Sequence, residues 1–297
     1  MIALKRKRAR GLFTPTVAAT GWGESTFAEI SWDKSRSAAM RWGFAGAAVG
    51  VLAALVCFAP AAWLARAVAS ATQDRLQLAD ARGTVWSGSA VAVLTGGVGS
   101  RDASSLPGRL SWTLRPQGLG VELTARHACC MNGDVAIRVK PGINRTEYTL
   151  VPPSGWVGQW PAAFLAGLGT PWNTLQLGGS VRLASPGLKV ESVQGRWLVD
   201  GRADIDMVNV SSRMTTLDSL GSYRVSVSGD AANPGFSKIG LTTQEGALKL
   251  GGEGTWGPAG LRVRGEASAA PAEEAALSNL LNIIGRRQGA RSVISIG

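Results

Sequence analysis

The chain has 297 residues, among them 39 glycines and eleven tryptophans. This length allows one or two domains, and the glycine content is too high for a helical protein but typical of many short strands joined by turns. The formal charge is +11, yet eight of the 31 basic residues precede residue 42 and no basic run or stripe follows them, which argues against a nucleic-acid partner.

The first predicted element is a transmembrane helix at residues 42–65, which follows a basic and polar leader at residues 1–41. The segment carries no charge over 24 residues, and a helix of about 36 Å can span a hydrocarbon core. Trp42 and Trp63 stand near its ends, where indole rings prefer the interface. The basic leader places the N-terminus in the cytoplasm and the rest of the chain beyond the membrane.

Two alternatives concern this segment. Ala67-Val68-Ala69 fits a signal-peptide cleavage pattern, but the leader and the apolar run are both longer than is usual, which favours a retained anchor. Gly46 and Gly50 have the GxxxG spacing that lets two membrane helices approach closely, which would allow a homodimer through this helix. Spans rich in alanine and glycine also produce that spacing by chance.

Beyond a helical connector at residues 66–80, apolar and polar residues alternate, which is the period of a half-buried strand. The short loops favour antiparallel pairing. We therefore predict a mainly β domain at residues 81–297, with about ten strands, one apolar face and one polar face. The alternation is clearest at residues 110–114, 119–123, 135–139, 175–183, 197–205, 223–227, 261–267 and 292–296.

Two segments interrupt the strands. Residues 154–172 hold three tryptophans around a short predicted helix from Pro161 to Gly167, and they form either a plug over one end of the sheet or a partner surface. At residues 271–285, proline begins a helix and glycine ends it. Its single apolar stripe predicts packing on the sheet itself, through Leu277, Leu280, Leu281 and Ile284.

Several tryptophans follow a glycine by two to four residues, as in Gly83 to Trp86 and Gly254 to Trp256. We interpret these pairs as hairpins in which glycine forms the bend and tryptophan covers the apolar face. That face is either a sealed core or an open groove. Its representatives are Trp86, Trp112, Trp197, Val225 and Val263.

Residues with catalytic or metal-binding chemistry are few. His127 is the one histidine, so multi-histidine metal centres are excluded. The adjacent Cys129 and Cys130 can form a vicinal disulfide in an oxidising compartment, whereas a metal site made with His127 is geometrically cramped. The GxGxxG pattern at residues 252–257 precedes a strand instead of the helix that dinucleotide binding needs. We predict no enzyme, no cofactor and no metal.

Two blocks of the chain, residues 60–97 and 250–297, resemble the type II secretion system protein N family. The resemblance implies a non-catalytic, single-pass protein of the Gram-negative inner membrane with a periplasmic β domain. It would contribute through periplasmic contacts to export of folded proteins, with other inner-membrane components and the outer-membrane secretin as partners besides the lipid bilayer. The residues of these blocks that carry the resemblance are Gly83, Trp86, Gly88, Gly254, Trp256, Asn282 and Gly285.

The predicted domain is also similar to the curved sheets of AsmA-like proteins, whose apolar concave faces are linked to lipid movement. This second resemblance implies an alternative function. The chain would then handle lipid, with the apolar face of its sheet as an open groove.

Overall fold

The computed structural model describes residues 22–153, 155–194, 196–230 and 232–297. The chain divides into two compact units between Cys57 and Phe58, and each is described by itself. The predicted leader lies outside the described residues up to residue 21. From Trp22 onward it is helical.

The first unit is the helix α1 (Trp22–Cys57). Its stretch Ala39–Cys57 is long and apolar enough to cross a membrane, judged by length and composition, and none of it is buried. Large apolar side chains such as Trp42, Phe44 and Leu52 are exposed. Exposure of these side chains to water would be unfavourable, whereas the lipid chains of a hydrocarbon core would solvate them.

The predicted span of residues 42–65 is divided in the structure. Helix α1 ends at Cys57, and a second helix, α2 (Ala61–Ala71), begins after Pro60. Proline has no N–H to continue the hydrogen-bond ladder of a preceding helix. Ala61 is buried in a cluster of the second unit. Trp63 therefore lies on α2, outside the apolar stretch that can span a membrane.

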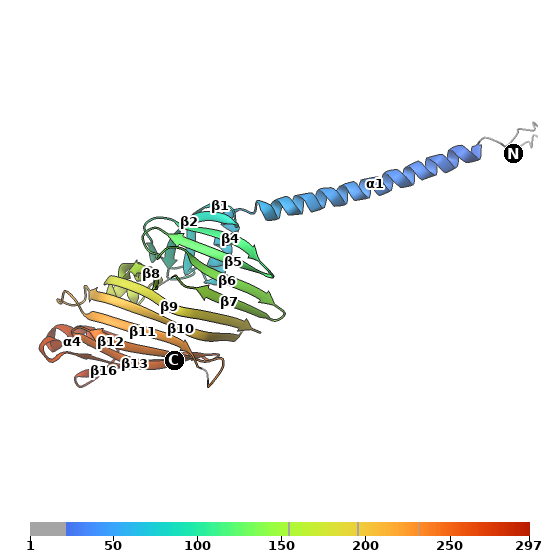
Figure 1. Ribbon diagram of the computed structural model, residues 1–297. Coiled ribbons are helices and arrows are strands. Elements are labelled where there is room, and N and C mark those ends of the chain that lie inside the picture. The colour runs from blue at the N-terminus through green and yellow to red at the C-terminus, as the bar shows by residue number, and fades with distance from the viewer. Residues whose placement is uncertain (1–21, 154, 195, 231) are drawn as a thin grey trace, which may run out of the picture. The chain divides into compact units, whose positions relative to one another are not determined.

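The second unit is built on one sheet of sixteen strands, in which all described pairs are antiparallel (Figure 1). Almost every strand pairs with its neighbours in the sequence; β3 pairs only with β2, and β8 pairs only with β9. The strands are β1 (Leu76–Gly83), β2 (Ser87–Thr95), β3 (Ala103–Ser105), β4 (Leu110–Gln117), β5 (Gly120–His127), β6 (Val135–Gly142), β7 (Arg145–Val151), β8 (Trp156–Pro161), β9 (Leu177–Val193), β10 (Arg196–Ser212), β11 (Gly221–Gly229), β12 (Ser237–Glu245), β13 (Leu248–Gly257), β14 (Gly260–Ala269), β15 (Arg286–Gln288) and β16 (Arg291–Ile296).

The predicted fold class is confirmed, because the chain is mainly β, antiparallel and curved, with few helices and one apolar helix near its N-terminus. The expected number of about ten strands is too low. The sequence analysis missed β13 because its glycines at 251, 252 and 254 interrupt the apolar alternation. Strand β8 was missed because its two tryptophans and a proline suggested irregular structure.

Short helical segments cover the two ends of the apolar side of the sheet. At the N-terminal end, α2 packs near Trp112, while the 3-10 helix η1 (Ala162–Leu168) brings Phe164 against Leu106. The predicted helix from Pro161 to Gly167 is thus a 3-10 helix, and its packing agrees with the first of the two alternatives, a plug over one end of the sheet. A one-turn helix, α3 (Trp172–Leu175), follows it.

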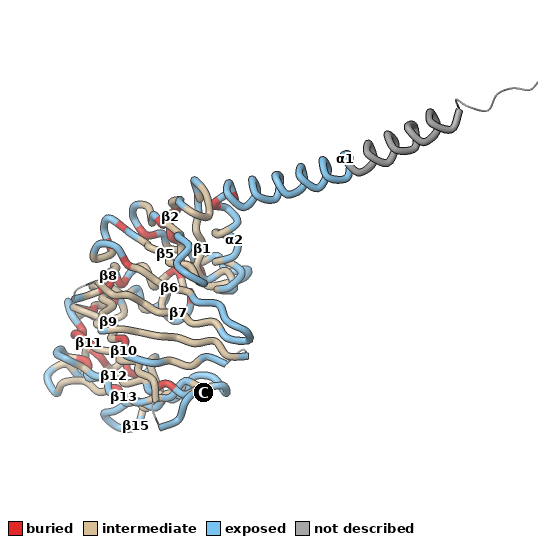
Figure 2. The backbone as a smooth tube through the Cα atoms, turned by 45° about the vertical axis from the view of Figure 1, so that its right-hand side comes forward, coloured by how far each residue is buried: buried red, intermediate tan, exposed pale blue. Residues whose placement is uncertain are grey.

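At the C-terminal end, the helix α4 (Glu274–Ile284) follows the turn η2 (Pro271–Glu273). Its side chains Leu277, Leu280 and Leu281 are almost fully buried against Tyr223 and neighbouring strands. The prediction that this helix packs on its own sheet is confirmed. Figure 2 shows that the long middle strands β9 and β10 are partly buried or exposed over most of their length, with few buried positions.

Replacing Leu280 with alanine should lower the free energy of unfolding by about 2–5 kcal/mol, because the truncation leaves a cavity in the cluster beneath α4. Urea titration of the full chain in detergent, followed by tryptophan fluorescence, measures the change. Ile283→Ala is the matched control, since Ile283 lies on the same helix and is 49% exposed. Equal losses in the two variants would contradict the packing described above.

Gly88→Ala should destabilise the N-terminal end of the sheet by about 1–3 kcal/mol, because the site is already full. A Cβ there would stand 2.5 Å from Cζ2 of Trp112 and 2.7 Å from the Arg82 carbonyl oxygen. At Gly251, also in a strand, an added Cβ meets nothing within 4 Å, so Gly251→Ala should be neutral in the same titration. A neutral Gly88→Ala variant would contradict this close approach.

Candidate functional site: an open apolar face

Antiparallel register brings apolar side chains from distant parts of the chain onto one side of the sheet. One row crosses β6, β7, β9 and β10, and a second crosses β9 to β12. Side chains directly opposite one another in such a ladder touch. We call these two rows the apolar face: Val139, Tyr148, Val190 and Val199 in the first, and Leu183, Ile205, Val225 and Leu241 in the second.

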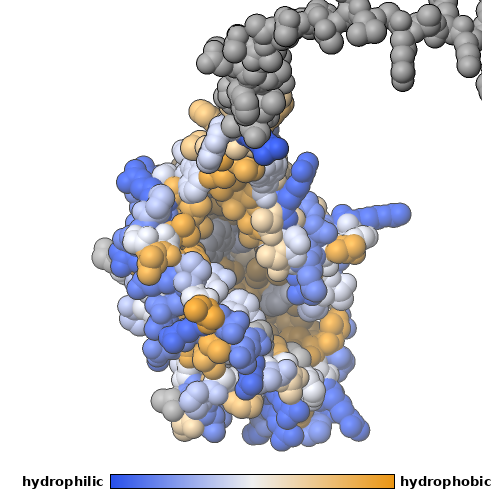
Figure 3. All heavy atoms as spheres, turned by 90° about the vertical axis from the view of Figure 1, so that its right-hand side faces the viewer, coloured by the Kyte–Doolittle hydropathy of each residue, from blue (hydrophilic) through white to orange (hydrophobic). Residues whose placement is uncertain are grey.

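The apolar face is only partly covered by the described residues. All eight of its side chains are of intermediate exposure. Trp197, at the start of β10, is 47% exposed, and its ring centroid lies 6.0 Å from that of Tyr148. Figure 3 shows the molecule hollowed, with hydrophobic side chains inside the hollow and hydrophilic ones around it. Contiguous exposed apolar surface of this kind marks sites of interaction.

The five residues predicted to represent the apolar side of the sheet do not form one cluster. Trp112 is buried at the N-terminal end, and its indole N–H donates to the Val85 carbonyl at 3.1 Å. Trp86 lies in the bend between β1 and β2 and is half-buried. Val225 and Val263 are half-buried, whereas Trp197 is exposed. The ends of this side are therefore packed, and its middle is open.

Several side chains that contribute exposed apolar surface were not predicted from the sequence. Phe236 and Leu261 are 43% and 40% exposed, and Tyr148 stands beside Trp197. No apolar alternation was read around Phe236, which precedes β12. The aromatic residue of RTEYTLV was a usable signal for β7, since tyrosine and threonine are common in strands.

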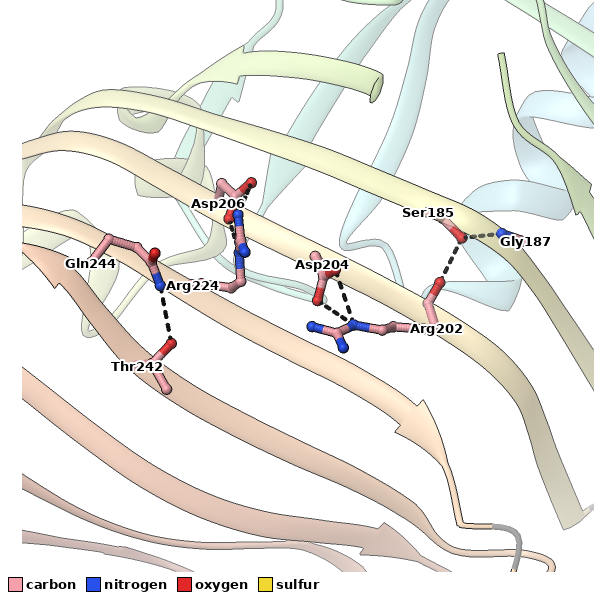
Figure 4. Close-up of polar contacts among 8 residues, drawn as sticks. All are labelled: Ser185, Gly187, Arg202, Asp204, Asp206, Arg224, Thr242 and Gln244. Atoms are coloured by element: carbon pink, nitrogen blue, oxygen red, sulfur yellow. Dashed lines mark hydrogen bonds and ion pairs between the residues drawn. The ribbon is translucent and has the colours of Figure 1, made fainter. Parts of the chain in front are cut away.

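The other side of the sheet is polar and carries ion pairs both between neighbouring strands and within one strand. Nε of Arg224 on β11 donates to Asp206 on β10 at 2.6 Å, and Nε of Arg202 lies 2.9 Å from Asp204 (Figure 4). Ser185 accepts from the Gly187 N–H and donates to the Arg202 carbonyl, which satisfies the bulge between β9 and β10. Asp204 and Asp206, both on β10, are thus each paired with an arginine.

A third ion-pair group lies on β7 and β9. Lys189 is 3.0 Å from Glu191 and 3.3 Å from Glu147. The hydrogen bond from Lys189, with help from Arg145, lowers the pKa of the Glu191 carboxyl. Solvent screens such exposed pairs and leaves them little effect on stability, so their main effect is to keep this side of the sheet hydrophilic.

The polar side is also hollowed, across β11 to β14. Gly240 and Gly251 have no side chains there, which leaves a depression of about 1360 Å³. Lys238, Glu253 and Arg264 border it. Because charges of both signs surround this depression, it offers no preference for an anion or a cation.

The single histidine and the paired cysteines lie together at the end of β5. Cys129 and Cys130 are joined by a disulfide. His127 is 2% exposed, and neither ring nitrogen has a hydrogen-bond partner among the described residues. Burial lowers the pKa of the His127 imidazole, so the ring is neutral near pH 7.

The glycines of the two sequence blocks have different structural roles. Gly83 has φ +88° at the bend before Trp86, a conformation that favours glycine. Gly254 lies inside β13 and not at a bend, so the predicted pattern of glycine bend and tryptophan cover fails there. Asn282 is exposed on α4, and Gly285 ends that helix in an extended conformation.

The glycine pair of α1 presents an open surface. A Cβ added at Gly46 or Gly50 would meet nothing within 4 Å. Trp42, at the start of the predicted span, is 79% exposed. Pairing of two copies through these glycines stays a prediction.

Comparison with known proteins gives one family. The model of type II secretion system (T2SS), protein N, matches residues 74–294. That match covers nearly all of the second unit, from Leu76 in β1 to β16. No curated protein and no solved structure matches the chain.

Proposed function

Because this chain belongs to the type II secretion system protein N family, we propose that it is an inner-membrane-anchored, non-catalytic component of that system. The family match over residues 74–294 is the observation that carries the proposal. The second unit, which carries the sheet and is called the β unit from here on, would lie in the periplasm. It would contribute through protein contacts to export of folded proteins across the outer membrane. Its partners would be other inner-membrane components and the outer-membrane secretin.

The arrangement of the chain supports this function. An apolar stretch, Ala39–Cys57, can hold the chain in a bilayer. Basic residues before it, among them Lys34 and Arg36, favour a cytoplasmic N-terminus. The β unit would then stand at the outer surface of the inner membrane, tethered within reach of membrane-anchored partners.

Loss of this protein should impair export in a bacterium that depends on the system. After deletion of the gene, secreted hydrolases should accumulate in the periplasm, because the outer-membrane step lacks a component. Enzyme activity in the medium and in periplasmic extracts measures the effect. The full chain should restore export, and unimpaired export in the deletion strain would contradict the proposal.

A complementing variant separates anchoring from the β unit itself. Residues 1–57 are replaced by a cleavable signal peptide, so that the β unit is exported without its membrane helix. If anchoring positions the contacts, this variant should restore export poorly at equal periplasmic abundance. Full restoration would contradict the anchored arrangement.

A second candidate function is lipid handling on the apolar face. The observation that favours it is the partial exposure of all eight side chains of that face, together with Trp197 at 47%. Acyl chains could cover such a surface by the same hydrophobic effect that covers a core. The ion-paired side of the sheet would stay in water.

Photo-crosslinking at neighbouring positions of β11 tests this second function. Val225 belongs to the apolar face, whereas Ser226 is of similar exposure and follows it on the same strand, so its side chain points to the opposite side. A photoreactive amino acid at Val225, but not at Ser226, should form phospholipid adducts detectable by mass spectrometry in cells. Protein adducts at Val225 would instead assign the face to a partner, and equal lipid labelling at both positions would count against a groove.

A further inference from the structure

The chemistry at the end of β5 is not used by either function. His127, Cys129 and Cys130 each offer one ligand atom, and these three atoms lie within 4.8 Å of one another. A thiolate and an imidazole are the ligands that soft cations prefer. The turn after β5 thus places the ligand atoms of these three residues close together, although their spacing in the sequence suggested a cramped site.

The fold itself holds the histidine in place. The N–H groups of Cys130 and Met131 both donate to the His127 carbonyl, at 3.3 and 3.2 Å. Gly108, with φ +95°, lies so near that an added Cβ would be 3.4 Å from Cε1 of the ring. The imidazole is therefore fixed between the turn and the loop before β4, and its position does not depend on side-chain hydrogen bonds.

The buried imidazole has two unsatisfied polar atoms among the described residues, Nδ1 and Nε2. An unpaired buried donor or acceptor is destabilising, so an apolar side chain of similar size would be more stable at this position. A bound cation would use the lone pair of one ring nitrogen. The orphaned ring is thus an observation, independent of the cysteine pair, that points to a ligand.

Access to the cluster is from one side. Cys130 is 3% exposed and packs beside Leu106 and Trp160, whereas Cys129 is exposed. An exchange partner can therefore reach the Cys129 sulfur. A cation held by all three residues would lie between solvent and the packed end of the sheet.

We propose that reduction of the disulfide between Cys129 and Cys130 creates a site for one soft d¹⁰ cation, Cu⁺ or Zn²⁺, bound by His127 and the two thiolates. A dithiol reductant supplies two electrons and two protons, its own sulfurs become a disulfide, and the S–S bond opens to two thiols. Cation binding then releases the two thiol protons to solvent, and neutral His127 supplies its lone pair. The proposal does not rest on the secretion function.

The two cations differ in how many of the ligands that they need this site supplies. Cu⁺ is favoured by soft thiolate ligands, and three ligands complete its coordination. Zn²⁺ prefers four ligands in a tetrahedron, so on this site it would need a water molecule as the fourth. Titration with each ion distinguishes the two.

The test uses the full chain in detergent, reduced and then freed of reductant under anaerobic conditions. Cu⁺ and Zn²⁺ are each titrated in competition with a chromophoric chelator, and released protons are measured in weakly buffered solution. We expect one ion per chain and two protons released per ion. The oxidised protein should bind neither ion.

Variants assign the binding to these residues. His127→Gln and Cys129→Ser should each abolish stoichiometric binding, whereas Cys57→Ser, which removes the third cysteine, should retain it. Cys129 is exposed, so its serine variant should keep the fold, as near-ultraviolet circular dichroism can verify. The proposal is overturned if the reduced chain binds neither ion, or if Cys129→Ser binds as the unaltered chain does.

Discussion

One continuous antiparallel register is the constraint on which the rest of this structure depends. Successive side chains in a strand point to opposite sides, so a slip of one residue would exchange the apolar and polar sides. Pairing of Ile205 with Val225, and of Val225 with Leu241, keeps apolar residues together on one side across three successive strands. Where the chain has an extra residue, as at Ser185, a bulge with its own hydrogen bonds restores the register.

The same constraint explains why the apolar side is not fully closed. A sheet of sixteen strands presents more apolar surface than α2, η1 and α4 can cover. These short elements seal the two ends, where Trp112 and Leu280 are buried. At about 25 cal/mol per Å² of apolar surface removed from water, the exposed middle leaves an appreciable driving force for association with lipid or protein.

Anchoring and reactive chemistry are placed at different parts of the chain. Ala39–Cys57 can lie in a bilayer, and Pro60 separates it from α2, which belongs to the β unit. The His127 cluster lies at the turn after β5, where β8 and η1 close the sheet. Reduction of the disulfide between Cys129 and Cys130 would therefore affect the sealed end of the sheet and not its open middle.

Much of this was predictable because it depends on local periodicity. The alternation in LRVRGEA and YRVSVS predicts strands with one apolar side, and the stripe of α4 predicts its packing, since each pattern reports which residues share a face. Strand β13 was not predictable in this way, because glycines carry no side chain to report a face. The division of the predicted span at Pro60 was not predicted, because a proline near the end of an apolar segment does not by itself end a membrane helix.

The sequence by itself determined the mainly β class, an apolar N-terminal segment, the family and the residue types of the apolar side. Only the tertiary structure decided that this side is sealed at its ends and open between them, and that the His127 ring is buried beside the cysteines with no hydrogen-bond partner among the described residues. The physical reason is that alternation fixes the direction of a side chain, whereas burial depends on which distant element covers it.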